Sequence, residues 1–121
     1  SAKERDREIV EATLTTFEAT LASGIRDRSW ERQSESALAS VFTSPALAGS
    51  RLGSINCVES LCKIVVQYDR QDHSDPMEVS ERVLAPFNAA AFFHHSPSTN
   101  ETYFYVARDG QPLPNLAPPA G

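Results

Sequence analysis

The sequence has few of the features on which function is most often built. It has two cysteines, three histidines and one tryptophan in 121 residues, and no apolar run approaches the roughly 18 residues that would cross a bilayer. Positive charge is scarce, because 11 Lys and Arg stand against 16 Asp and Glu and give a formal net charge of −5. An acidic chain repels a phosphate backbone and offers no polybasic patch to anionic lipid. We therefore expect neither nucleic acid nor a membrane surface as a direct partner of this domain.

Known catalytic motifs are missing as well. The chain has no glycine-rich phosphate loop, no Gly-x-Ser-x-Gly elbow and no His-Glu-x-x-His helix. Its carboxylates lie where solvated helix faces and turns would place them, as for Glu31, Glu35, Glu59, Glu78 and Glu81. His94 and His95 are adjacent on a predicted strand and point to opposite faces, and His73 lies in a loop, so no set of ligands converges on a metal. The sequence predicts no enzyme, no catalytic residue, no cofactor and no metal site.

The cysteines, Cys57 and Cys62, are the most informative residues that are present. A β-branched run follows the second cysteine, which predicts a strand, and the four residues between the cysteines predict a turn. Pairing of residues 51–57 with residues 62–68 places the two cysteines opposite each other on one face of the sheet. We expect a disulfide that fixes this hairpin, while a redox-active dithiol, a metal site and free thiols are alternatives. A disulfide in turn favours an oxidising compartment.

Two helices precede the hairpin. Apolar residues recur at spacings of four, three and four between residues 4 and 22, namely Val10, Leu14, Phe17 and Leu21. Gly24 follows as a C-terminal stop, and the mixed charges of residues 3–8 form either a solvated helix end or a stalk. Ser29 is the expected N-cap of a second helix from Trp30 to Phe42, with Trp30 in the core. The short connection predicts that the two helices pack as an antiparallel pair.

The remaining elements complete an α+β domain. Asp75, Pro76 and Glu78 have the spacing of a capping box and open a third helix that Pro86 limits. Residues 91–95 and 102–107 then form a second hairpin. We expect one domain over residues 1–111 in the order α-α-β-β-α-β-β, with a four-stranded antiparallel sheet and the helices on one face. Residues 112–121 form a proline-rich tail that is extended unless Leu113 and Leu116 dock on the domain.

Aromatic residues of the second hairpin supply the candidate binding surface. Strand alternation sends part of this set away from the core, and the set contains Phe92, Phe93, Tyr103, Phe104 and Tyr105. The set either forms ordinary cross-strand packing or presents a patch to a partner protein or peptide. We take Tyr103, Tyr105 and Glu59, at the tip of the first hairpin, as candidate partner-binding residues.

Several segments together resemble a known group. These are the tryptophan-containing helix, the Cys-x4-Cys-Lys stretch of residues 52–66, the Ala-Pro-Phe of residues 85–87, and the Gly-x-x-Leu-Pro ending at residues 110–114. The pattern is similar to uncharacterised exported or membrane-anchored proteobacterial domains to which no activity is assigned. The resemblance implies export and an antiparallel sheet backed by helices. The chain begins Ser1-Ala2-Lys3, so we expect that an upstream signal peptide or anchor was removed.

These observations favour a non-enzymatic accessory or interaction domain of a bacterial envelope protein. We expect it to be periplasmic or otherwise extracytoplasmic, and to bind a protein or peptide through the outer sheet face or a sheet edge. The alternative is a small acidic periplasmic inhibitor or immunity-type protein that inserts Glu59 into a basic cleft. A weaker third hypothesis is a small-ligand pocket between the helices and the sheet.

Overall fold

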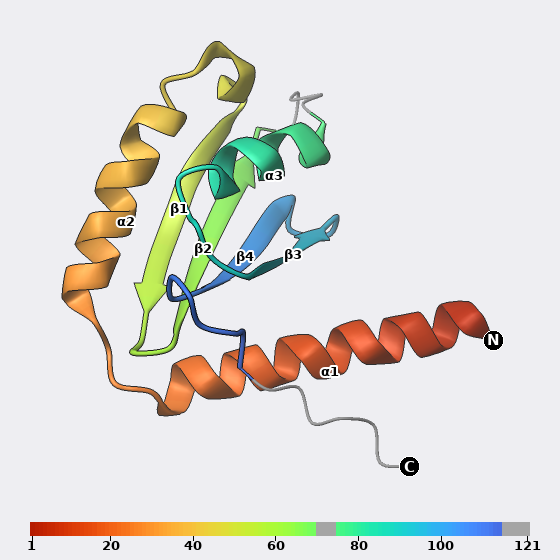
Figure 1. Cartoon of the computed structure of the whole chain (residues 1–121). Coiled ribbons are helices and arrows are strands. Elements are labelled where there is room, and N and C mark those ends of the chain that lie inside the picture. Colours follow the sequence, from red (N-terminus) through yellow and green to blue (C-terminus); the bar gives the residue numbers. More distant parts are fainter. Residues whose placement is uncertain (70–74, 115–121) are drawn as a thin grey trace.

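The computed structural model describes residues 1–69 and 75–114. Along the chain its elements are α1 (Ala2–Ser23), α2 (Arg28–Val41), the short 3-10 turn η1 (Pro45–Leu47), β1 (Ser50–Cys57), β2 (Leu61–Tyr68), α3 (Pro76–Leu84), β3 (Ala91–Ser96) and β4 (Glu101–Ala107) (Figure 1). The strands form an antiparallel sheet in the order β1-β2-β4-β3, so β1 and β3 are its edges. The predicted α+β class and element order are confirmed.

The first hairpin has the predicted register. Cys57 pairs with Cys62 and Ile55 with Ile64, and the two buried cysteines form a disulfide. The Val58 N–H donates to the Leu61 carbonyl at 2.9 Å, which closes the strands around the two tip residues. A β-bulge interrupts the β1–β2 pairing between Leu52 and Ser54. The regular part of β1 therefore runs from the bulge to the disulfide.

Helices cover both faces of the sheet, so the prediction that they lie on one face was wrong. Phe104 and Val106 of β4 face a core cluster that includes α2 and α3, whereas Tyr105 between them faces α1. The reason is that β2 and β4 carry apolar residues on both faces, and each face must be covered. The predicted antiparallel helix pair was also wrong, because α1 packs against β2 and α2 against β1.

Helix ends differ from prediction at one point. Asp27, and not Ser29, is the N-cap of α2, and its carboxylate accepts from the Trp30 N–H at 3.0 Å. Trp30 is half-buried, so it is a less complete core anchor than the sequence predicted. Asp75 and Pro76 begin α3 as predicted, with the Asp75 carboxylate accepting from the Met77 N–H.

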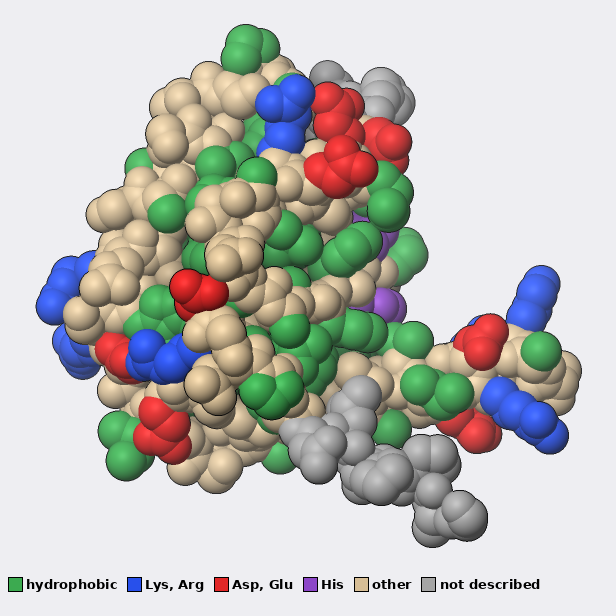
Figure 2. All heavy atoms as spheres, in the orientation of Figure 1, with side chains coloured by type: hydrophobic (Ala, Val, Ile, Leu, Met, Phe, Trp, Pro, Cys, Tyr) green, Lys and Arg blue, Asp and Glu red, His purple; other side chains and the backbone are tan. Residues whose placement is uncertain are grey.

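The N-terminal helix and the start of the proline-rich segment differ in how they contact the domain. The N-terminal half of α1 projects past the sheet with side chains of both charges on its surface (Figures 1 and 2), and residues 1–9 are all exposed. Leu113, in the first residues of the proline-rich segment, packs on the cluster beneath α1. The second predicted docking residue, Leu116, lies outside the described residues, as does His73.

Candidate functional site

The three candidate binding residues lie in different environments. Glu59 is exposed at the tip of the β1–β2 hairpin, Tyr103 is half-buried on the α1 side of the sheet, and Tyr105 is only 2% exposed. Tyr105 is therefore not an accessible contact residue. Tyr103 pairs with Val65, four residues along β2 from Leu61 at the tip, which corresponds to about 13 Å of extended strand. Glu59 and Tyr103 thus do not form one patch.

Tyr105 instead anchors α1 to the sheet. Its ring lies 4.9 Å from that of Phe17, and its hydroxyl donates to Glu18 Oε2 at 2.7 Å. The Lys63 ammonium pairs with the same carboxylate oxygen at 2.8 Å. Burial, followed by the bond to the Glu18 carboxylate, raises the pKa of Tyr105. A residue held in this way stabilises the domain and is not available to a partner.

Tyr103 is also engaged by its neighbours. Its hydroxyl donates to Glu101 Oε1 at 3.0 Å, and the Lys63 ammonium lies 4.9 Å from the centre of its ring. A hydrogen bond from Gln67 is the main cause that lowers the pKa of Glu101. These contacts make a connected polar surface across β2 and β4.

Arg108 holds the hairpin tip. Its guanidinium stacks 4.4 Å over the ring of Trp30, pairs with Asp27, and donates through Nε to the backbone carbonyl of Glu59. The hydrogen bond from the Trp30 N–H is the main cause that lowers the pKa of Asp27, and Arg108 lowers it further. The Glu59 carboxylate itself has no hydrogen bond or ion pair within residues 1–69 and 75–114. The tip is thus fixed by the disulfide on one side and by Arg108 on the other, with its carboxylate facing outward.

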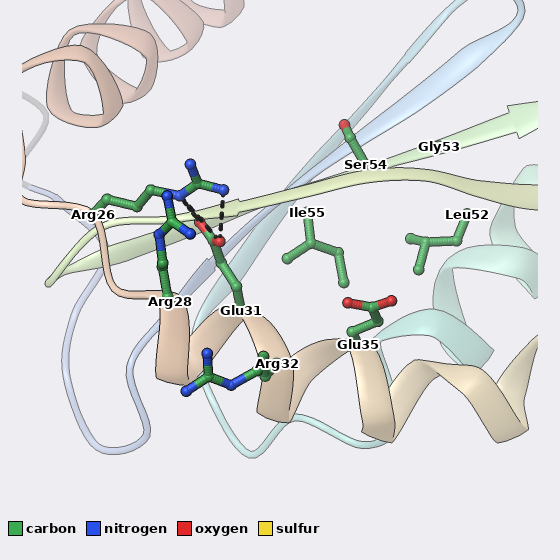
Figure 3. A pocket seen from close by; sticks show the side chains of 9 residues that line it. All are labelled: Arg26, Arg28, Glu31, Arg32, Glu35, Leu52, Gly53, Ser54 and Ile55. Atoms are coloured by element: carbon green, nitrogen blue, oxygen red, sulfur yellow. Dashed lines mark hydrogen bonds and ion pairs between the residues drawn. The ribbon is translucent and has the colours of Figure 1, made fainter.

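A groove between α2 and the edge strand β1 is the feature that the sequence did not reveal. It has a volume of about 460 Å³ and is lined on the helix side by the linker and α2 and on the sheet side by residues 52–55 (Figure 3). In Figure 3 Leu52 and Ile55 point toward α2, whereas Ser54 points to the other side. The floor of the groove is therefore apolar and its helical wall is charged.

The α1–α2 linker already occupies one end of this edge. Arg26 forms an antiparallel bridge with Val58, and the Asp27 N–H donates to the Cys57 carbonyl at 2.8 Å. The approach is close, because a Cβ on Gly24 would lie 2.8 Å from the Cβ of Val58. Arg26 and Asp27 thus pair with the hairpin tip as a short strand would, and α2 begins at the next residue, Arg28.

Glu31 also covers the disulfide end of the β1 edge. Its Oε2 accepts from the Cys57 N–H at 2.9 Å and from Arg26 Nε at 3.0 Å. The hydrogen bonds from Arg26 are the main cause that lowers the pKa of Glu31. Both outward backbone groups of Cys57 are therefore satisfied.

Ile55 lies two residues before Cys57, and its outward backbone groups are not covered by the linker. In an antiparallel ladder the backbone groups alternate in direction, so the N–H and C=O of Ile55 point outward like those of Cys57. In the described part of the chain no group pairs with them. They are an open donor and acceptor at the sheet edge, inside the groove.

Charge is unevenly distributed in the groove. Arg26, Arg28 and Arg32 lie toward the end at which α2 begins, and Glu35 points toward Leu52 and Ile55 farther along (Figure 3). Arg26 is occupied by Glu31, but Arg28 and Arg32 form no ion pair with any residue that the structure describes. Basic side chains also gather at the α2 side in Figure 2. Two arginines of an acidic chain are thus available next to an open strand edge.

Comparison with known proteins adds no assignment. No protein family, curated protein or solved structure matches this chain. Within the described residues no group of three metal-ligating side chains converges, and no helix there is long and apolar enough to span a membrane. The disulfide is the feature that bears on location, and it favours a compartment outside the reducing cytoplasm.

One sequence signal could have indicated the groove. Three arginines fall within residues 26–32 of a chain that has only 11 basic residues. The sequence did not show, however, that β1 is an edge strand or that α2 lies along it. Both follow from the strand order, which depends on contacts between distant segments.

Proposed function

We propose that this chain is a non-enzymatic interaction domain of an extracytoplasmic protein, and that it binds an extended segment of a partner protein along the edge of β1. The observation that carries the proposal is the outward N–H and C=O of Ile55, which lie unpaired in a groove between an edge strand and a helix. Addition of a peptide strand to such an edge is a common mode of recognition. Periplasmic location and an upstream anchor are parts of the same proposal, supported by the disulfide and by the envelope-protein resemblance.

The pairing of the α1–α2 linker with the same edge supports this mode of binding. Asp27 already donates to the edge at Cys57, so the edge accepts a neighbouring chain at the next outward position. A bound segment would continue from this point toward the bulge at residues 52–54. It would form two hydrogen bonds with Ile55 and place alternate side chains over the apolar floor of the groove.

Backbone pairing alone is too weak to give useful affinity. Two hydrogen bonds contribute about 1–3 kcal/mol net, whereas micromolar binding requires about 8 kcal/mol. The side chains of the groove must therefore supply most of the binding free energy. This requirement makes the groove, rather than the edge by itself, the proposed site.

A proline substitution tests the proposal directly. Peptides selected from a random library of about ten-residue segments, a length typical of a long strand, are measured against the wild type, Ile55→Pro and Ile55→Ala. Both variants lose apolar side-chain atoms, but only proline removes the outward N–H, and it leaves the β1–β2 ladder intact. We expect Ile55→Pro to weaken binding about tenfold or more beyond Ile55→Ala.

The location of the bound peptide is checked by amide hydrogen exchange. The Ile55 amide should become protected when peptide is added, because it gains a partner. Selected peptides that bind both variants equally and leave this amide unprotected would show that β1 is not the binding edge.

Glu59 supports a second candidate function, that of an inhibitor. Its carboxylate is exposed and unpaired in the described structure, and it stands on a tip fixed by the disulfide and by Arg108. A rigid, outward carboxylate is suited to insertion into a basic cleft, since little order is lost on binding. Under this hypothesis Glu59→Lys abolishes inhibition of a basic envelope enzyme, whereas Glu59→Lys has no effect on peptides bound at β1.

A further inference from the structure

We infer that the segment bound along β1 is acidic: a carboxylate of the partner pairs with Arg28 and Arg32, and a neighbouring apolar side chain covers Leu52 and Ile55. This inference rests on the proposed function, since it names the chemistry of the segment that the edge accepts. It is carried by the juxtaposition of two unpaired arginines, an apolar floor and an open backbone donor in one groove.

Neither Arg28 nor Arg32 forms an ion pair within the described residues, and the charge of Arg28 contributes only the last of the effects that lower the pKa of Glu31. Arg28 and Arg32 are one turn apart on α2 and are exposed. Of the two acidic residues that line the groove, Glu31 is occupied by Arg26 and the Cys57 N–H, and Glu35 forms no ion pair with either arginine among the described residues. An external anion is the complementary partner.

The residue type also suits a carboxylate ligand. A guanidinium presents a planar set of donors that matches both oxygens of a carboxylate, and it is less strongly hydrated than an ammonium. Arginine thus suits recognition of a carboxylate at this exposed wall. All three basic residues of the groove are arginines, as are most basic residues of this chain, in which only Lys3 and Lys63 are lysine.

The distribution of charge along the groove determines where the acidic residue of the segment lies. The arginines lie toward the end at which the linker enters α2, while Glu35 stands farther along beside Leu52 and Ile55 (Figure 3). A second carboxylate at the Glu35 end would be repelled, so the acidic residue belongs at the linker end. An uncharged apolar residue is favoured in the middle.

The test uses the same random peptide library with two arginine variants. Peptides are selected on the wild type and then measured against Arg28→Gln/Arg32→Gln and against the control Arg5→Gln/Arg7→Gln. The control removes the same charge at two exposed arginines of α1 that do not line the groove. Melting temperatures of both variants are compared with that of the wild type to confirm that each is folded.

The inference predicts that acidic peptides are selected, and that binding is lost only in the groove variant, Arg28→Gln/Arg32→Gln. Selected peptides should be enriched in Asp or Glu, should bind the groove variant at least tenfold more weakly, and should bind the control with unchanged affinity. Substituting Gln for the selected acidic residue should weaken binding to the wild type and have no effect on binding to the groove variant.

The opposing outcomes separate this inference from the proposed function. Peptides that lose binding in Ile55→Pro but show no acidic enrichment and no response to the arginine variants would overturn the acidic ligand and leave strand addition standing. If no peptide is selected, or if selected peptides are insensitive to Ile55→Pro, both proposals are overturned.

Discussion

A single carboxylate, that of Glu31, joins α2 to the edge of the sheet. It is 9% exposed and accepts hydrogen bonds from the Cys57 N–H and from Arg26. A buried backbone N–H without a partner destabilises a protein, so Glu31 closes the strand edge as well as balancing an arginine. The same side chain limits how far a partner strand can extend toward the disulfide.

We predict that Glu31→Ala lowers the free energy of unfolding by about 1–3 kcal/mol, because the Cys57 N–H is left unpaired. Glu31→Gln keeps an oxygen acceptor there and loses only the ion pair with a half-exposed arginine, so it should cost less than about 1 kcal/mol. Chemical denaturation of the two variants measures both values. Equal losses would show that the Cys57 bond contributes little.

The ion pair also predicts a dependence on pH. The pKa of Glu31 is lowered in the folded state from its ordinary value of 4.5. Its ionised form therefore adds stability above that pH, and this stability is lost as the pH falls through the lower folded pKa. The stability difference between wild type and Glu31→Gln should be constant near neutral pH and should shrink below 4.5. A difference unchanged in acid would contradict the role of this carboxylate.

At the scale of elements, the first hairpin was the part most fully predicted from sequence. The two cysteines flank a turn, and the two isoleucines lie at the same spacing from them, so only one register places all four side chains on one face. The start of α3 was predicted for a similar reason, since Asp75 and Pro76 act locally. The N-cap of α2 was missed because Asp27 and Ser29 are both suitable caps, and Arg108, 81 residues away, pairs with Asp27.

The disulfide gives a prediction for this hairpin. A bridge that closes so short a loop constrains the unfolded chain modestly, so its removal should cost about 2 kcal/mol. Mass analysis after alkylation, without and then with reductant, should show the native protein without free thiols and the reduced protein with two. Denaturation of the reduced protein measures the loss of stability. Alkylation of unreduced native protein would contradict the disulfide and the compartment inferred from it.

At the scale of the whole molecule, the placement of α1 could not be predicted from its apolar stripe. Phe17 and Leu21 indicate a buried face but not which surface buries it. The decisive contacts come from the far end of the chain, where Tyr105 and Phe92 meet Phe17. The groove was missed for the same reason, because its two walls come from α2 and β1 and its accessibility depends on strand order.

The two halves of α1 should differ in their contribution to stability. Phe17 is fully buried, so Phe17→Ala should lower the free energy of unfolding by about 3–5 kcal/mol. Removal of residues 1–8 should change it by less than about 0.5 kcal/mol, since these residues are exposed. Denaturant titrations of both proteins provide the comparison. A large loss on truncation would mean that the projecting half packs on the domain in solution.

The projecting part of α1 also determines how the molecule rotates. The N-terminal part of α1 projects past the sheet, and its exposed residues 1–9 span about 13 Å of helix, at ~1.5 Å per residue. A body with such an extension tumbles anisotropically, with slower reorientation of its long axis. Amide bond vectors in α1 lie nearly parallel to the helix axis, so their nitrogen-15 relaxation should give longer apparent correlation times than the vectors of the sheet.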